Sequence, residues 1–139
     1  METMYAAEGC GLAGTQVGIH KRVIVLDLSY KDSSFLPMKM ANPEILWKST
    51  TTCRYEEGCL SVPGQSAFIE RAEHVHVRYL DENNHLQEIK AEEFLAVCLQ
   101  HEIDHLDGKI YIDYLSPLKR QLLIQKAQKV AREQKSKEQ

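Results

Sequence analysis

The chain has 139 residues, of which 43% are hydrophobic and 27% charged, with a formal net charge of −3. This composition excludes a disordered chain and suits one domain with a single core. No stretch reaches the ~18 apolar residues of a membrane span and no leader resembles a signal peptide, so we expect a cytoplasmic protein. Its cysteines should then be thiols or metal ligands rather than disulfides. They are Cys10, Cys53, Cys59 and Cys98.

The small net charge hides a split along the chain. Residues 1–118 carry 10 Lys and Arg against 18 Asp and Glu, whereas residues 119–139 carry 7 against 2. A basic terminal segment on an acidic body often binds a polyanion, although a solvated helix with a frayed tail has the same composition. We therefore treat residues 1–118 as the body of the domain, and residues 119–139 as the rest of its basic C-terminal helix and tail.

The first third of the chain predicts a helix, a loop and two strands. Residues 1–7 suit a helix, and four glycines between residues 9 and 18 predict a tight loop. The apolar run at 23–28 is typical of a buried strand. Residues 40–47 predict a second strand, broken at Asn42-Pro43.

The middle of the chain predicts a hairpin that leads into a helix. Val75 and Val77 alternate with polar residues, as in a half-buried strand, and turn residues at 81–84 precede a partner strand at 85–90. From residue 92 apolar side chains lie nearly all round a helix, so this helix should be buried. Asp107-Gly108 ends it.

The last segment predicts a short strand at 110–112 and a helix that begins at Ser116-Pro117, an N-cap and first-turn pair. The apolar face predicted for that helix comprises Leu115, Leu118 and Leu122. Together the elements predict an α+β fold, in which short, mostly antiparallel strands surround a central buried helix and a C-terminal helix lies outside.

The buried helix carries the sequence His101-Glu102-Ile103-Asp104-His105. Two histidines four residues apart share a helix face and can bind one ion, and Glu102 is placed to exchange protons with a metal-bound water. Burying so many polar groups in an apolar helix is costly unless they are paired or bind a metal. The motif therefore predicts a metal site.

A catalytic metal site needs a third protein ligand. The candidates are Cys10, Cys53, Cys59, Cys98, His74, His76, Asp113, Glu133 and Glu138. Cys98 lies about 10.5 Å along the helix axis from His105, too far to share its ion, and is expected to line a pocket instead. The two upstream histidines should face solvent. Cys59 is the best candidate, because Gly58 before it allows close approach of the backbone.

Three motifs together resemble those of the peptide deformylase family. Residues 9–16 read G-C-G-L-A-G-T-Q and match the family's G-x-G-L-A-A-x-Q, except that Gly14 replaces alanine. Residues 57–61 match E-G-C-L-S, and residues 100–108 match Q-H-E-x-D-H-L-x-G. The similarity runs to about residue 118, and the C-terminal helix is similar to that of the bacterial type. Family members normally begin with a leading strand and the start of the first helix, which we expect this sequence to lack.

The resemblance implies a metal-dependent amide hydrolase that removes the formyl group from N-formylmethionine of newly made chains. Cys59, His101 and His105 would hold one divalent ion, Fe(II) in many members, although zinc, nickel and cobalt also suit these ligands. Glu102 would move the protons of the reaction. The Gln16 amide and the backbone N–H of Leu60 would stabilise the oxyanion.

Further residues are expected to border the site. Cys10 and Gly11 should edge the substrate cleft, together with Gly58, so that an extended peptide can bind the backbone. Gly14 should give a slightly looser loop beside the site. Asp104, buried next to the ligands, needs a cation, for which Arg71 is the candidate.

The expected partners are a formylmethionyl peptide and, through the basic helix, the ribosome. We expect a monomer without membrane contact. Two other hypotheses remain at this point. A zinc peptidase would cleave internal peptide bonds and would not need Cys59. A metal-stabilised module would bind RNA through its basic tail without hydrolysis.

Overall fold

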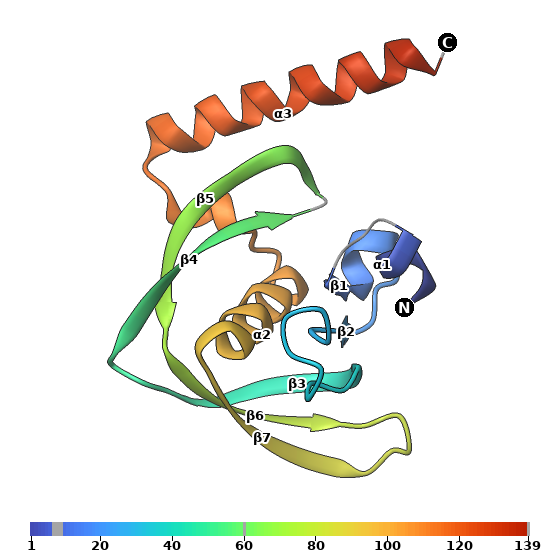
Figure 1. Ribbon diagram of the computed structural model, residues 1–139, viewed down its shortest axis with the longest axis vertical. Coiled ribbons are helices and arrows are strands. Elements are labelled where there is room, and N and C mark those ends of the chain that lie inside the picture. The colour runs from blue at the N-terminus through green and yellow to red at the C-terminus, as the bar shows by residue number, and fades with distance from the viewer. Residues whose placement is uncertain (7–9, 60, 139) are drawn as a thin grey trace.

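The computed structural model describes residues 1–6, 10–59 and 61–138. Its elements are α1 (Glu2–Ala6), β1 (Gly11–Ala13), the 3₁₀ turn η1 (Gly14–Val17), β2 (Val23–Leu26), β3 (Met38–Lys48), β4 (Thr52–Cys59), β5 (Val62–Ala72), β6 (His74–Leu80), β7 (Leu86–Glu92), α2 (Glu93–Leu106), the 3₁₀ turn η2 (Tyr111–Tyr114) and α3 (Pro117–Lys137). All strand pairs are antiparallel. The α+β prediction is confirmed, with α2 between the sheets and α3 outside (Figure 1).

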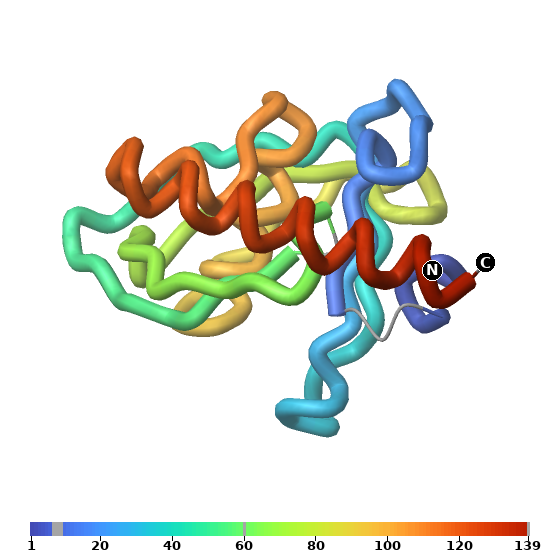
Figure 2. Tube along the Cα trace, turned by 90° about the horizontal axis from the view of Figure 1, so that it is seen from above, coloured from blue at the N-terminus to red at the C-terminus, as the bar shows by residue number. Residues whose placement is uncertain are grey.

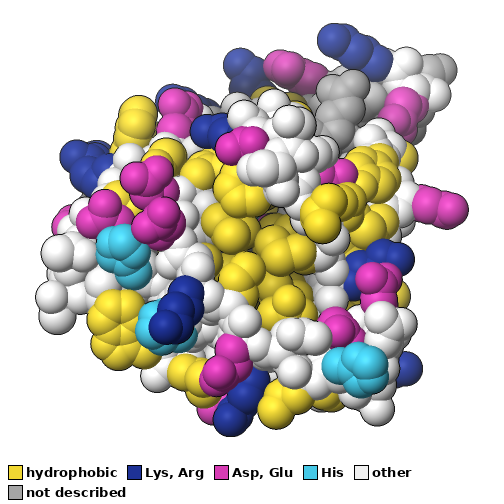
Figure 3. Space-filling model, turned by 60° about the horizontal axis from the view of Figure 1, so that its bottom comes forward, with side chains coloured by type: hydrophobic (Ala, Val, Ile, Leu, Met, Phe, Trp, Pro, Cys, Tyr) yellow, Lys and Arg dark blue, Asp and Glu magenta, His cyan; other side chains and the backbone are white. Residues whose placement is uncertain are grey.

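Five strands form the main sheet, in the order β1-β2-β3-β6-β7, and β4 pairs with β5 in a separate hairpin. The alternation in β6 places Val75 and Val77 in the core, where both are fully buried. They pack with α2 residues such as Leu99, so the helix is buried as predicted. Seen from the side of β6 and β7, hydrophobic side chains occupy the centre of the face and charged ones surround them (Figure 3).

The break predicted in β3 is present. Asn42 has a φ of 50°, and the pairing of β3 with β6 shifts register between Ala41 and Glu44, as in a β-bulge. The glycine-rich loop is only partly as predicted. Gly11–Ala13 forms a short edge strand, because its backbone pairs with β2, and only then does the chain turn at η1.

One further prediction is wrong. Residues 110–112 form no strand, because Asp113 accepts a hydrogen bond from the backbone of Ile110 at 2.9 Å and closes the turn η2. Pro63 and Gly64 lie within β5. Gly64 has a φ of +73° and approaches Val130 of α3 closely, so glycine is required there by both backbone and space.

Helix α3 begins at Ser116, whose side chain accepts a hydrogen bond from the backbone of Lys119, and it stays helical to Lys137 instead of fraying earlier. Its predicted apolar face is only partly right, because Leu115 packs against the cluster of buried residues from β5, η2 and α3 but Leu118 and Leu122 are 70% and 47% exposed. Ala127 is buried instead, on the face that lies along β5 and η2 (Figure 2). Among the described residues, no helix is long and apolar enough to cross a membrane.

Candidate active site

Three side chains from two elements converge at one point. Cys59 ends β4, and His101 and His105 lie one turn apart on α2. Their potential ligand atoms all lie within 4.8 Å of one another. The Nε2 atom of His105 is 3.2 Å from Cys59 Sγ and 3.2 Å from His101 Nε2. An ion with bonds of about 2.0–2.3 Å to nitrogen and sulfur would bridge such atoms, so these residues fit a divalent metal.

The surroundings of Cys59 favour its thiolate form. Burial opposes ionisation of its thiol, but hydrogen bonds with His101 and His105 outweigh burial and lower the pKa of Cys59 to about 5. A thiolate is therefore the favoured form at neutral pH, and the thiolate is the form that coordinates metals.

Glu102 lies beside this cluster. Its Oε1 atom is 4.0 Å from His101 Nε2, and its Oε2 atom is buried without a hydrogen-bond partner among the described residues. Burial raises the pKa of Glu102 to about 7. A β-carbon on Gly11 would lie 2.8 Å from Glu102 Oε1, so the glycine of β1 makes room for this carboxyl group. A buried carboxyl group with one free oxygen atom is suited to accept and return a proton.

Gln16 directs its amide toward the same point. Its Oε1 atom accepts a hydrogen bond from the backbone of Ala13 at 2.8 Å, which fixes the orientation of the amide. Its Nε2 atom donates to Cys59 Sγ and to Ser61 Oγ, both at 3.3 Å. Thr15 binds the carbonyl of His105 at 3.2 Å and so ties η1 to α2. A hydrogen-bond donor is thus held next to the cluster.

Glu57 contacts the nitrogen of His101 that faces away from the cluster, and Arg71 in turn binds Glu57. The Nδ1 atom of His101 is 2.8 Å from Glu57 Oε1, and Arg71 binds both carboxylate oxygens of Glu57, at 2.6 and 2.9 Å. Although burial acts against it, hydrogen bonds with His101 and Arg71 hold the pKa of Glu57 below its ordinary value. An ionised Glu57 only accepts hydrogen bonds, so His101 presents Nδ1–H to it and turns Nε2 toward the cluster.

The prediction that Arg71 neutralises Asp104 is confirmed, with Arg71 Nη1 at 2.8 Å from Asp104 Oδ2. The bond from Arg71 to Glu57 and the hydroxyl of Tyr114, which donates to Asp104 at 2.6 Å, were not predicted. Glu57 precedes Cys59 by two residues, and this i, i+2 spacing on a strand places both side chains on one face. That spacing was the available signal for Glu57.

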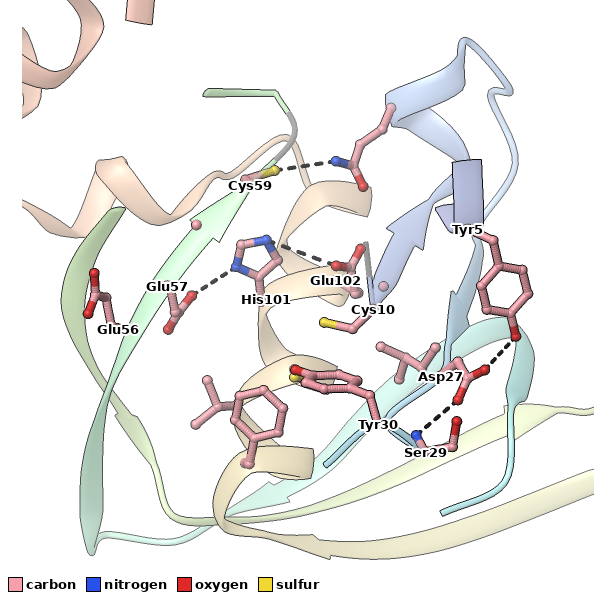
Figure 4. Close-up of a pocket in the computed structure, with 17 residues that line it drawn as sticks. Tyr5, Cys10, Asp27, Ser29, Tyr30, Glu56, Glu57, Cys59, His101 and Glu102 are labelled. Atoms are coloured by element: carbon pink, nitrogen blue, oxygen red, sulfur yellow. Dashed lines mark hydrogen bonds and ion pairs between the residues drawn. The ribbon is translucent and has the colours of Figure 1, made fainter. Parts of the chain in front are cut away.

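A pocket of about 700 Å³ opens onto this cluster (Figure 4). Cys10, Gly11, Gln16 and Gly58 line it, as does Cys98, which takes no part in the ligand cluster. The histidines of β6 lie elsewhere, since His76 packs against Trp47. Leu60 lies outside the described residues. Apolar walls with one polar end suit a peptide side chain beside a reacting amide.

The comparisons with known proteins agree on one family. The family model for polypeptide deformylase matches residues 1–121. The chain belongs to the peptide deformylase family. The peptide deformylase of Tolumonas auensis is 54% identical over 134 residues, which are 96% of this chain and 78% of that protein. That of Bartonella henselae is 48% identical over 138 residues, which are 99% of this chain and 78% of that protein.

Solved deformylase structures share the fold. The crystal structure of a peptide deformylase from Legionella pneumophila superposes with a TM-score of 0.88 at 44% identity and covers 96% of this chain and 77% of that one. The structure from Ehrlichia chaffeensis in complex with actinonin has a TM-score of 0.86 at 44% identity, over 92% and 77% of the two chains. The function that follows is removal of the N-formyl group from newly made polypeptides.

The departure from the deformylase motif at Gly14 has a structural consequence. A β-carbon at this position would lie 2.9 Å from the side chain of Val23 and 3.1 Å from the carbonyl oxygen of Lys21. The neighbouring chain therefore fills the space of the missing methyl group. The loop is packed tightly here, and the looser loop that we expected is wrong.

Proposed function

We propose that this deformylase is a metal-dependent enzyme in which Cys59, His101 and His105 hold one divalent ion. Fe(II) is the proposed native ion, and zinc, nickel and cobalt suit the same ligands. When bound, the ion acidifies water and supplies hydroxide at neutral pH. The observation that carries the proposal is the convergence of these three potential ligand atoms beside the buried carboxyl group of Glu102, whose Oε2 atom has no hydrogen-bond partner among the described residues.

Glu102 is the proposed general base and acid. It takes a proton from the water that attacks the formyl carbon. When the C–N bond breaks, it returns that proton to the amine nitrogen of methionine, so that formate and a free amino terminus are released. Because Glu102 is buried, bulk water does not compete for the proton during the transfer.

Gln16 is the proposed oxyanion donor. Its Nε2 atom, oriented by the bond from the Ala13 backbone to Oε1, points toward Cys59 Sγ, and the formyl oxygen is proposed to develop its negative charge beside it. One such donor contributes about 10²–10³ in rate. The backbone N–H of Leu60 is proposed as the second donor on the basis of the family motif alone.

The pocket is proposed to receive the methionine side chain and the peptide that follows it. Val97 and Cys98 offer it an apolar wall. Cys10, Gly11 and Gly58 border the opening and leave backbone groups accessible to an extended peptide.

A formate-release assay on a formyl-methionyl peptide tests this function, with anaerobically iron-loaded and zinc-loaded protein compared. We expect formate from the loaded protein, and none after Cys59→Ala. An unformylated, N-acetylated peptide of the same sequence is the control for cleavage of internal bonds. Internal cleavage of that peptide, with no formate from the formylated one, would instead identify a peptidase.

We further propose that the protein is a monomer of the bacterial cytoplasm and contacts the ribosome through α3. The helix lies on the outside of the domain (Figure 2). Its exposed basic side chains include Lys119, Arg120, Lys126, Lys129 and Arg132. Sedimentation with ribosomes should fall after Lys129→Glu and Arg132→Glu together and should fall with salt. Unchanged sedimentation would remove the ribosome from the proposal.

A further inference from the structure

A chain of polar contacts runs from a proposed metal ligand to Tyr114. His101 contacts Glu57, and Arg71 binds Glu57 with two nitrogen atoms. The third nitrogen of Arg71 contacts Asp104 Oδ2 at 2.8 Å. The hydroxyl of Tyr114 donates to that same oxygen at 2.6 Å. Every contact in the chain is within 2.9 Å, so each member restrains the position of the next.

The inner members of this chain are shielded from water. The side chains of Arg71, Glu57 and Asp104 are 5%, 6% and 14% exposed. Such buried charge contacts are screened little and depend strongly on geometry. Tyr114 covers the outer end, and the guanidinium of Arg71 lies 5.0 Å from the centroid of its ring. A change at Tyr114 therefore bears directly on the Arg71 contacts.

The chain also joins the elements that supply the ligands. Glu57 lies on β4 with Cys59, whereas Asp104 lies on α2 with His101. Arg71 on β5 binds to both sides and fixes the hairpin against the helix. Tyr114 ends η2, directly before α3, so it brings the start of the C-terminal helix into the same network.

We propose that Tyr114 is a positioning residue for the metal centre. By holding Asp104 in place on Arg71, its hydroxyl keeps Glu57 aligned with His101. This inference rests on the ligand role proposed above for the Cys59–His101–His105 cluster. Partners of metal ligands typically change metal affinity by about 10–100-fold when removed. Since Tyr114 lies further along the chain, we expect a change of about tenfold, the lower end of that range.

The test compares Tyr114→Phe with Tyr111→Phe. Both variants lose one hydroxyl from η2 and keep the ring. Tyr111 is a matched control, because its hydroxyl is buried and has no hydrogen-bond partner among the described residues. Zinc affinity is measured on metal-free protein by competition with a chromophoric chelator. We expect about tenfold weaker binding for Tyr114→Phe, a shifted absorption spectrum of its cobalt form, and wild-type values for Tyr111→Phe.

Other outcomes separate the alternatives. Wild-type zinc affinity in Tyr114→Phe, with or without lower thermal stability of the metal-free protein, would overturn the inference and leave the proposed function standing. Failure of the wild-type chain to bind zinc would overturn both. In an Asp104→Asn background, Tyr114→Phe should cause no further loss of affinity. A full tenfold further loss there would contradict the route through Asp104.

Discussion

Two hydrophobic cores of unequal size meet at the site. The larger is formed by α2 and the five-stranded sheet and includes Leu99 and Val77. The smaller is formed by the hairpin, η2 and α3 and includes Ile69 and Ile112. The larger core is aliphatic and surrounds one helix on several sides, whereas the smaller one is a thin layer between a two-stranded sheet and α3.

The ligand cluster draws on both cores. His101 and His105 belong to the helix of the larger core, and Cys59 packs against the smaller one. The helix sets the spacing of two proposed ligands by its own geometry, whereas the position of the third depends on how the hairpin packs against the helix. The Arg71–Asp104 ion pair and the contact of Glu57 with His101 cross the same boundary. The site thus depends on how the two cores are joined.

The largest expected effect comes from a substitution that abolishes the proposed proton transfer and leaves both cores intact. In Glu102→Gln the side chain keeps its shape but no longer moves a proton, so formate release should fall by about 10²–10⁴. Metal content should be unchanged, because Glu102 is not one of the proposed ligands. Formate production and metal analysis on the same sample check this. Retention of more than a tenth of the activity would show that Glu102 is not the base.

The next largest effect is the loss of unfolding free energy when a buried side chain is shortened in each core. Leu99 is fully buried, so Leu99→Ala should cost about 2–5 kcal/mol of unfolding free energy. Ile69→Ala in the smaller core should lie near the lower end of that range, because a two-stranded sheet relaxes into a cavity more easily. Denaturant unfolding at fixed metal occupancy measures both. A larger loss for Ile69→Ala would reverse the ranking of the two cores.

Removal of the metal should destabilise the smaller core more than the larger one. With metal at 100 times its dissociation constant, binding stabilises the folded state by about 2.7 kcal/mol. Because the proposed metal would link Cys59 to α2, its removal should increase amide hydrogen exchange in β4 and β5 more than in β6 and β7. Hydrogen exchange followed by mass spectrometry measures the increase in each sheet. A uniform increase over both sheets would mean that the cores unfold as one unit.

The smallest effect concerns the attachment of α3. Ser116→Ala removes the N-cap of this helix and should cost about 1 kcal/mol. Ser136→Ala, on an exposed position near the end of the same helix, is the matched control and should change stability by less than about 0.5 kcal/mol. Thermal unfolding compares the pair. Equal effects would show that the cap does not hold α3.

Local patterns explain which parts of the fold could be predicted. Helix α2 and the hairpin of β6 and β7 have strong periodicity and clear end signals, so both were found near their observed ends. The turn η2 was mistaken for a strand because an aromatic and β-branched run looks alike in both. The packed face of α3 was not predicted. Ala127 is buried and Leu118 is exposed because only Ala127 lies against the hairpin and η2, and a local sequence pattern does not show which face of a helix is covered.

Some contacts of the candidate site could likewise be predicted from local patterns, and others could not. The i, i+4 histidines and Glu102 follow from helix geometry, so the sequence is enough to group them. Arg71 was paired with Asp104 from charge alone, but its second bond to Glu57 depends on the register of β4 with β5. Tyr114 reaches Asp104 only because η2 turns the chain, and the sequence predicted a strand there instead of this turn.

One metal ion is proposed to be held jointly by residues of both cores. The most direct measurement is a titration of metal-free protein with zinc, comparing the wild-type chain with Cys59→Ala and His105→Ala. We expect one ion per wild-type chain, and a large loss of affinity when a ligand is removed from either core. Wild-type affinity in Cys59→Ala would contradict the account, because the metal would then belong to α2 alone.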